Sequence, residues 1–158
     1  TTFWPSPQQV ARLAKSYKAG PMNKGLDETV VTQVHYPLSD RGERFPMPAG
    51  GLFSTAQDVA RFYQLLLNNG ELEGKRYLTE SAVKQLTNRQ TPAELKNSYG
   101  LGFAATDKTF GHGGAYSTDT TAHRDRGLIT IWLVQHASFP GAGKEAQQDF
   151  KKWALDRP

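Results

Sequence analysis

The 158-residue sequence predicts an α+β fold, in which an antiparallel sheet of about three strands is flanked by helices. Residues 55–69 repeat apolar side chains at helical spacing, which indicates an amphipathic helix. Residues 128–135 (LITIWLVQ) form the most apolar run and are typical of a strand covered on both faces. The β-prone segments near the end of the chain have short connections, which favours antiparallel pairing.

The first 36 residues predict a helix, a loop and a short strand. Ser6-Pro7 is a helix start, since serine caps well and proline suits the first turn. An apolar stripe at helical spacing follows this start and ends before Gly20-Pro21. It consists of Val10, Leu13, Ala14 and Tyr17. Residues 19–28 are loop-like, and the β-branched residues 29–36 indicate a strand.

Residues 37–51 are rich in proline, glycine and charge. A flexible linker and a shaped loop both have this composition, because each Pro or Gly fixes or frees a particular φ. We favour the shaped loop, since a linker would not need Phe45 and Met47.

Two capped helices follow, separated by a small hairpin. Thr55 begins a helix that runs to about Asn69, with Gly70 beyond its end. Its core-facing side chains are predicted to be Val59, Phe62, Tyr63 and Leu66. Residues 72–78 form a hairpin around Glu73-Gly74, and Thr79 caps a helix to about Asn88. Residues 90–98 are a polar loop.

The last third predicts three antiparallel strands and a final helix. The strands are residues 99–105, 116–123 and 128–135. After Pro140-Gly141 the helix buries a stripe made of Ala146, Phe150, Trp153 and Ala154. Trp132 and Trp153 are both interpreted as core residues, as large aromatics on buried faces usually are.

Composition excludes several functions. The net charge is +4, but the basic residues are scattered without a stripe, so we expect no nucleic-acid partner. The absence of cysteine excludes disulfides and thiolate metal sites. The four histidines lack metal-ligand spacing, so neither a metal nor a cofactor is expected. No apolar run is long enough to span a bilayer.

The stretch of most chemical interest is residues 110–118, FGHGGAYST. Glycines lack a Cβ, so a substrate's backbone could lie against such a strand, with His112 as a titratable donor beside it. Gly-Gly pairs also mark bulges and turns, and a lone histidine is often an ordinary surface residue. Both interpretations stay open on this motif alone.

Three segments together resemble the serine β-lactamase-like family, which includes class C β-lactamases, D-alanyl-D-alanine carboxypeptidases and esterases. They are residues 48–62 (PAGGLFSTAQDVARF), 99–103 (YGLGF) and 110–117 (FGHGGAYS), in the family's order. The resemblance runs from about Ala49 to the end. It implies that residues 49–158 are the C-terminal part of the β-lactamase-like domain, and that residues 1–48 are a variable inserted helical region of the same structural unit.

The resemblance also implies roles in acyl transfer. His112, Gly113 and Gly114 match the family's strand motif, and Ala115 would supply one backbone N–H of the oxyanion hole. Such a donor is worth about 3 kcal/mol to a transition state. His112 would add a hydrogen bond or a positive charge facing a substrate carboxylate.

The family's nucleophile motif is Ser-x-x-Lys, and its second motif is Tyr-x-Asn or Ser-x-Asn. Ser81-Ala82-Val83-Lys84 matches the first by letter, but we reject it, because Ser81 and Lys84 lie on the solvated face of a predicted helix. A catalytic lysine should be desolvated to stay neutral near pH 7. No second motif occurs.

We therefore expect a C-terminal fragment of a serine hydrolase acting on an ester, amide or β-lactam through an acyl-enzyme, with the nucleophile supplied elsewhere. The alternatives are a non-catalytic β-lactamase-like binding or interaction domain and a small autonomous domain with coincidental motifs. Because the fragment would leave part of its sheet uncovered, we expect self-association. A periplasmic or extracellular location is implied by the resemblance only.

Overall fold

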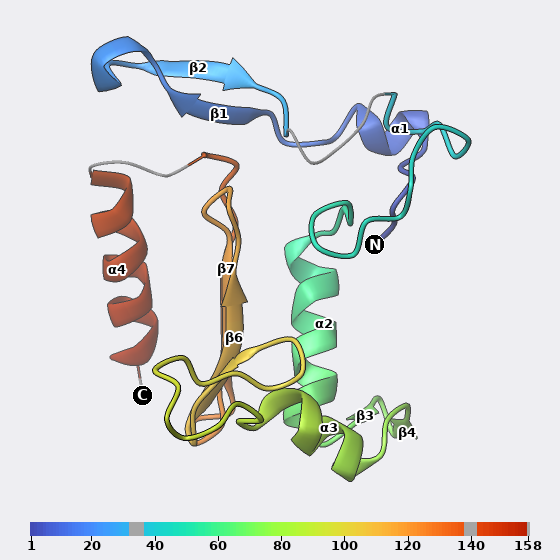
Figure 1. Cartoon of the computed structure of the whole chain (residues 1–158), viewed down its shortest axis with the longest axis vertical. Helices are drawn as coiled ribbons and strands as arrows, with labels where there is room; N and C mark the ends of the chain where they lie inside the picture. Colours follow the sequence, from blue (N-terminus) through green and yellow to red (C-terminus); the bar gives the residue numbers. More distant parts are fainter. Residues whose placement is uncertain (32–36, 138–141, 158) are drawn as a thin grey trace.

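The computed structural model describes residues 1–31, 37–137 and 142–157. Figure 1 shows the arrangement of its elements. The helices are α1 (Pro7–Val10), the 3₁₀ turn η1 (Pro21–Asn23), α2 (Ala56–Leu67), α3 (Glu80–Thr87) and α4 (Ala142–Leu155). The strands are β1 (Ser16–Ala19), β2 (Leu26–Thr29), β3 (Glu71–Leu72), β4 (Lys75–Arg76), β5 (Ala104–Ala105), β6 (Thr109–Gly113), β7 (Asp119–His123) and β8 (Leu128–Trp132).

The main sheet has four antiparallel strands in the order β5-β6-β7-β8. Helix α2 lies on one side of this sheet and α4 on the other (Figure 1). The register places Phe110, Ala122 and Ile129 side by side on the α2 face. The neighbouring row, with Gly111, Thr121 and Thr130, therefore faces α4, because side chains alternate along a strand. This arrangement confirms the predicted α+β class.

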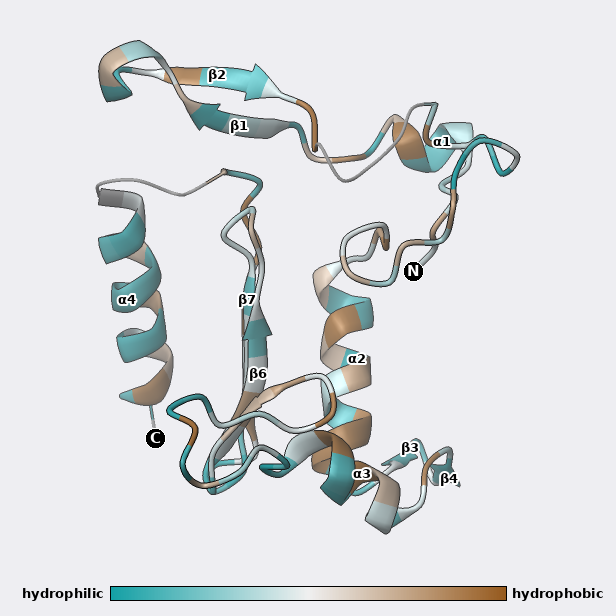
Figure 2. Cartoon of the chain, in the orientation of Figure 1, coloured by the Kyte–Doolittle hydropathy of each residue, from teal (hydrophilic) through white to brown (hydrophobic). Residues whose placement is uncertain are grey.

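The core lies between α2, α3 and the sheet. Tyr63 stacks on Phe110 with ring centroids 5.8 Å apart, and Phe103 meets both rings edge-on at 5.6 Å. Leu66 and Val83 are buried beside them. Such aromatic pairs add to the stabilisation that comes from burying their surface. The opposite interface is more polar: Figure 2 shows α4 as mostly hydrophilic, with hydrophobic residues toward its C-terminal end.

The caps of α2 and α3 were predicted correctly. The Thr55 side chain accepts a hydrogen bond from the Asp58 N–H, and that of Thr79 accepts one from the Ala82 N–H. The hairpin between these helices is confirmed as well. Glu73 and Gly74 have φ of 54° and 75°, as expected for the two central residues of a type I′ turn.

The predicted helix over residues 6–17 is wrong beyond its first turn. Ser6 does cap α1 through a capping box with Gln9, but α1 contains four residues. The expected stripe has no surface to cover, and Val10 is 36% exposed. Without a surface to cover, the apolar stripe gains little from extending the helix beyond its capped first turn. Tyr17 instead lies in β1, where its N–H and C=O bond to Gln135 and Ala137.

The interpretation of residues 19–28 as a loop is also wrong in part. Residues Leu26–Thr29 are β2, which pairs with β1 in register Ser16↔Thr29. The predicted strand over 29–36 is wrong for residues 30 and 31, because β2 ends at Thr29, and residues 32–36 lie outside the described part of the chain. Figure 1 shows this hairpin lying beyond the end of the main sheet.

The loop 37–51 contains no helix or strand, and a buried arginine shapes it. Arg44 is 5% exposed, and its guanidinium donates to the Phe3 and Leu38 carbonyls. Phe45, which suggested a shaped loop from the sequence, is 78% exposed. The shaped loop thus forms around Arg44, because a buried guanidinium must satisfy its donors.

Residues 99–105 do not form one strand. Only Ala104 and Ala105 pair with β6, and the chain reverses before them through a bond from the Gly100 N–H to the Phe103 carbonyl. Gly102 has φ of +116°, which favours glycine. Glycines that were interpreted as alternate strand positions therefore build a turn. Similarly, β7 begins at Asp119 rather than at residue 116, and β8 ends at Trp132.

Some predicted core residues lie at the surface. Phe62 on α2 is 48% exposed and Trp153 on α4 is 54% exposed. Ala146 is exposed as well. Trp153 lies near the end of α4, where its ring stacks on Phe150 and lies under the Arg157 guanidinium. Sequence periodicity predicted which face of α4 is apolar, but the sheet covers only part of that face. In the described ranges, every helix is too short or too polar for a membrane span.

Candidate functional site

The predicted site residues lie at the end of the β6–β7 hairpin. His112 and Gly113 close β6, and Gly114 and Ala115 enter the turn to β7. The Gly114 N–H donates to the Thr118 carbonyl at 2.8 Å, and the Ser117 N–H donates to the Gly114 carbonyl at 2.9 Å. These two bonds fix a tight turn, so the backbone direction at all four predicted residues is determined.

The turn is also anchored to the segment that follows β8. The Ser117 hydroxyl donates to the His136 carbonyl at 2.9 Å, and the His136 N–H donates to the Tyr116 carbonyl at 3.2 Å. The Tyr116 hydroxyl reaches the Val30 carbonyl near β2. Three separate parts of the chain thus hold this end of the sheet in place.

The outer edge of β6 is open beside the predicted residues. Since Gly114 bonds inward to Thr118, alternation turns the N–H and C=O of Gly113 outward, away from β7. Strand β5 pairs only with Phe110 and Gly111 and so stops short of this point. Within the described ranges, the Ala115 N–H has no acceptor either. An extended ligand could therefore pair with the edge at Gly113 and Ala115.

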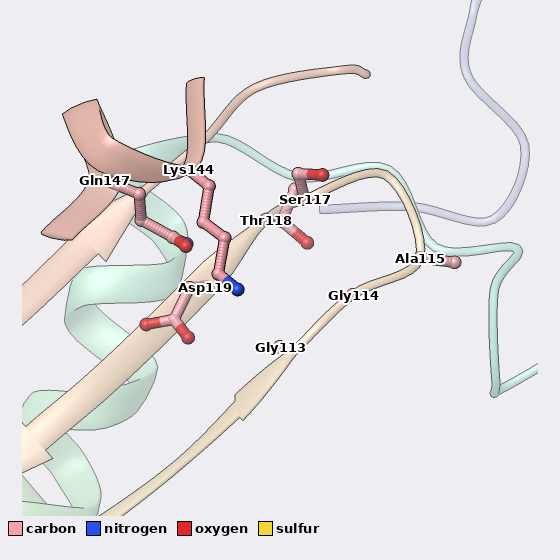
Figure 3. Close-up of a pocket in the computed structure, with 8 residues that line it drawn as sticks. All are labelled: Gly113, Gly114, Ala115, Ser117, Thr118, Asp119, Lys144 and Gln147. Carbon is pink, nitrogen blue, oxygen red and sulfur yellow. The ribbon is translucent and has the colours of Figure 1, made fainter. Parts of the chain in front are cut away.

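A surface hollow of about 430 Å³ adjoins this edge on the α4 side (Figure 3). It is lined by Gly113, Gly114, Ala115, Ser117, Thr118, Asp119, Lys144 and Gln147. In Figure 3, the Lys144 and Gln147 side chains extend from α4 toward the hairpin, and the Asp119 side chain of β7 lies beside them. The hollow is therefore built by the hairpin on one side and the first turns of α4 on the other.

The charges at this hollow favour an anionic group. Asp119 pairs with the Lys151 ammonium at 2.9 Å and accepts from the Thr121 hydroxyl at 3.2 Å, so its negative charge is compensated. Lys144 makes no ion pair with any described residue. Its ammonium is therefore available to an anionic ligand group, which the net charge of +4 would also attract.

His112 lies apart from this hollow. It shares the α2 face with Phe110 and Thr120, whereas Gly113 faces α4. The imidazole is exposed, its Nε2 lies 3.2 Å from the Tyr99 hydroxyl, and its Nδ1 is hydrogen-bonded to the Gly113 carbonyl. The structure thus brings Gly113, Gly114 and Ala115 together at one hollow and leaves His112 on the other side of the strand.

The glycines of this stretch are under different constraints. A Cβ on Gly111 would lie 2.2 Å from the Thr120 carbonyl oxygen, and one on Gly114 would lie 2.3 Å from the Thr118 hydroxyl. Gly111 is therefore required by packing against backbone, whereas a Cβ at Gly114 would need the Thr118 hydroxyl to rotate away. A Cβ on Gly113 would meet nothing closer than 3.6 Å. Packing therefore does not require glycine at position 113, and the absence of a side chain there leaves the adjoining space open.

The structure agrees with the rejection of Ser81-x-x-Lys84 as a nucleophile motif. Both side chains are exposed on α3, and the Ser81 hydroxyl lies 3.3 Å from that of Thr79, the cap of its own helix. Across the described ranges, no serine hydroxyl is hydrogen-bonded to a lysine or histidine side chain. The same ranges contain no cluster of three potential metal ligands.

Sequence reasoning missed three residues at this end of the molecule. Lys144 and Gln147 were not singled out, because helical periodicity indicates only that they lie off the apolar face of α4. Tyr99 was assigned to a strand and given no role. The one sequence signal for Tyr99 is its position directly before the turn at residues 100–102, which brings the chain back to β6.

The chain is an α+β domain whose sheet is flanked by helices on both faces. One edge of this sheet, at β6, has unpaired backbone donors and borders a polar hollow. Residues 1–151 match the Beta-lactamase family, and because this match covers most of the chain, the chain belongs to that family. The family match also excludes the coincidental-motif alternative, and it indicates a serine hydrolase-like origin.

Two proteins of Mycobacterium tuberculosis are similar to this chain. They are Protein Rv1367c of strain ATCC 25618 / H37Rv and Uncharacterized protein MT1414 of strain CDC 1551 / Oshkosh. Each is 33% identical over 113 residues, which covers 55% of this chain and 28% of the relative. The chain thus matches well under half of either relative, and neither printed name states an activity.

Proposed function

We propose that this chain supplies the strand wall of a serine hydrolase site that cleaves an ester, amide or β-lactam through an acyl-enzyme. In this proposal the attacking serine and its base come from residues outside these 158. The supporting observation is the open edge at Gly113 and Ala115, whose backbone donors border a hollow large enough for a small molecule.

The chemical roles follow from this geometry. The Ala115 N–H would donate to the oxygen that becomes negative when the hydroxyl attacks the carbonyl carbon. The missing side chain of Gly113 would let the substrate approach the strand closely. Lys144 would attract a carboxylate or another anionic group of the substrate, and its exposed position makes that attraction sensitive to salt.

Backbone donors matter because they are aimed before the reaction starts. An amide that is fixed by a tight turn does not have to reorganise when charge develops, unlike water. The turn at Gly114–Ser117 and its anchoring through Ser117 provide this rigidity. Removing one such donor from an acyl-transfer site typically lowers kcat by about 10²–10³.

The first test is labelling with a fluorescent penicillin and a fluorophosphonate. We expect neither reagent to modify this chain, because no serine in the described ranges is hydrogen-bonded to a lysine or histidine side chain. Stoichiometric labelling of Ser81, identified by peptide mass spectrometry and abolished in Ser81→Ala, would contradict the proposal. The matched control is Ser54→Ala, whose serine is also exposed.

The second test locates binding without requiring turnover. In an amide NMR titration with benzylpenicillin, the N–H resonances of Gly113, Gly114 and Ala115 should shift together. Lys144→Gln should weaken the response. Added salt should weaken the response of the wild-type chain but not that of Lys144→Gln. A response confined to other regions of the chain, or no response at millimolar ligand, would count against this site.

A non-catalytic binding or interaction module is the second candidate, since no complete nucleophile-and-base pair is found in the described residues. The coding sequence around this segment separates the two functions. Ser-x-x-Lys followed by Tyr-x-Asn upstream supports the hydrolase, whereas their absence supports the binding module. An exported location belongs to the hydrolase proposal and follows from the family resemblance.

We further propose that the isolated chain self-associates through β8. Among the described strands, β8 pairs with β7 alone, so no described strand lies along the other edge at residues 128–131. This edge carries no charge, and Leu133 beyond it is 46% exposed. Sedimentation velocity should show a concentration-dependent dimer that Ile131→Lys abolishes, and a strictly monomeric chain would contradict this part of the proposal.

A further inference from the structure

We infer that Tyr99 is a positioning residue that holds the His112 imidazole with its proton on Nδ1. The inference rests on the proposed function only in placing both residues at that site, and its test requires no catalysis. Three observations carry it: the contacts of the imidazole, the fixation of Tyr99, and the direction of the Gly113 carbonyl.

Both nitrogens of the His112 ring have partners. Nδ1 contacts the Gly113 carbonyl, and Nε2 lies 3.2 Å from the Tyr99 hydroxyl. A carbonyl oxygen only accepts, so the proton of this bond must be on Nδ1. In the neutral ring Nε2 is then the acceptor, and the Tyr99 hydroxyl must donate to it. The hydrogen-bond pattern therefore selects one tautomer.

The same partners also suit the charged ring. A hydroxyl both donates and accepts, so Tyr99 can accept from Nε2–H once the imidazole is protonated. The bond from Nδ1 to the Gly113 carbonyl is unchanged in that state. Both forms of the ring therefore keep the same two partners in the same orientation.

Tyr99 is itself fixed, so the arrangement does not depend on two loose side chains. Its N–H donates to the Thr91 hydroxyl at 3.1 Å, and its carbonyl accepts from the N–H groups of Gln90 and Thr91. Its side chain is half-buried, and its ring meets the imidazole edge-on with centroids 6.0 Å apart. The polar loop 90–98 thereby sets where the phenol lies relative to β6.

The consequence concerns the open strand edge. Gly113 presents an N–H and a C=O outward, and the His112 Nδ1–H occupies the C=O. One of the two lone pairs of this carbonyl is thus taken, whereas the N–H groups of Gly113 and Ala115 donate to no described residue. This balance favours ligand groups with acceptor oxygens, such as an ester, a lactam carbonyl or a carboxylate.

The test is ¹⁵N NMR of the histidine side chains of the full 158-residue chain, at a pH where the rings are neutral. In the wild type, the two His112 nitrogens should have clearly separated shifts, with the protonated type at Nδ1. In Tyr99→Phe, which removes only the hydroxyl, Nε2 loses its hydrogen-bond donor and only the Nδ1–H bond to Gly113 still favours this tautomer. The Nε2–H tautomer should therefore gain population, and the two shifts should move toward each other.

The matched control is Tyr77→Phe, because Tyr77 is exposed and its hydroxyl is not hydrogen-bonded to any described residue. This variant should leave the His112 shifts unchanged. Thermal unfolding of both variants shows whether each is folded. Wild-type shifts in a folded Tyr99→Phe variant, or a proton on Nε2 in the wild type, would overturn the inference.

The outcomes remain distinct from those of the proposed function. A failed tautomer test leaves the Ala115 donor and the hollow as they are. Conversely, an edge that binds no ester or lactam would refute the hydrolase proposal, while the Nδ1–H tautomer would still be measured.

Discussion

Residues 1–48 and residues 49–158 differ in what holds them together. After Ala49, the aromatic cluster around Tyr63, Phe103 and Phe110 packs α2 and α3 against the sheet. Before Ala49, the buried apolar side chains among the described residues include Pro5 and Leu38, and this region depends on the β1–β2 hairpin, the Arg44 bonds to backbone carbonyls and the Thr2–Phe53 bridge. The C-terminal region is stabilised mainly by buried apolar side chains and the N-terminal region largely by hydrogen bonds to the backbone. One such hydrogen bond contributes less net free energy of folding than one fully buried large apolar side chain.

The largest expected effect comes from removing the central ring of the cluster. Phe110→Ala should lower the free energy of unfolding by about 3–5 kcal/mol, because it leaves a cavity under Tyr63 that the sheet cannot fill. Urea denaturation followed by tryptophan fluorescence measures it. Phe45→Ala, in the N-terminal region, is the matched control and should change stability by less than about 0.5 kcal/mol. Similar effects in the two variants would break the contrast between the regions.

Alkaline pH provides a second measure of the same core. Burial raises the pKa of Tyr63 to about 12 from its usual value near 10. The unfolded chain therefore loses this proton first, and between pH 10 and 12 the folded state binds more protons than the unfolded state. Stability should fall there by about 1.4 kcal/mol per pH unit from this group.

Tyr63→Phe should remove this part of the pH dependence while leaving the ring stack in place. The measurement is urea denaturation at several pH values for the variant and the wild type. Parallel stability curves above pH 10 would show that the phenol ionises without leaving the core.

The glycines sharpen the comparison at the level of single residues. Gly111→Ala should destabilise by about 1–3 kcal/mol, since its Cβ would overlap the Thr120 carbonyl. Gly113→Ala, two positions along the same strand, should stay within about 0.5 kcal/mol. Thermal unfolding of the two variants side by side checks this. Under the proposed function, Gly113→Ala should nevertheless weaken the NMR response to benzylpenicillin.

The smallest expected effect compares two equivalent caps. Thr55→Ala should cost about 1 kcal/mol, because Thr55 caps a twelve-residue helix that is part of the core. Ser6→Ala removes the same kind of hydrogen bond from α1, which has four residues and none buried, so global stability should barely change. Hydrogen exchange of the α1 amides should rise in this variant, and equal losses in global stability would show that α1 is coupled to the core after all.

The local rules of the sequence determined the capped helices, the Glu73-Gly74 hairpin and the antiparallel class, because caps, turns and apolar periodicity act within a few residues. The glycine stretch was singled out from the sequence, and the family resemblance assigned Gly113, Gly114 and Ala115 their proposed roles. The structure brings these three residues together at one hollow.

Only the tertiary structure decided the fate of segments whose pattern lacked a partner. The stripe from Val10 to Tyr17 has helical spacing, but with no surface to cover, most of it became a turn and a strand. Likewise, only packing placed Lys144 opposite Gly113, and only the loop 90–98 placed Tyr99 beside His112. Periodicity specifies which face of an element is apolar, whereas contacts between distant residues decide what that face meets and which polar groups meet beside it.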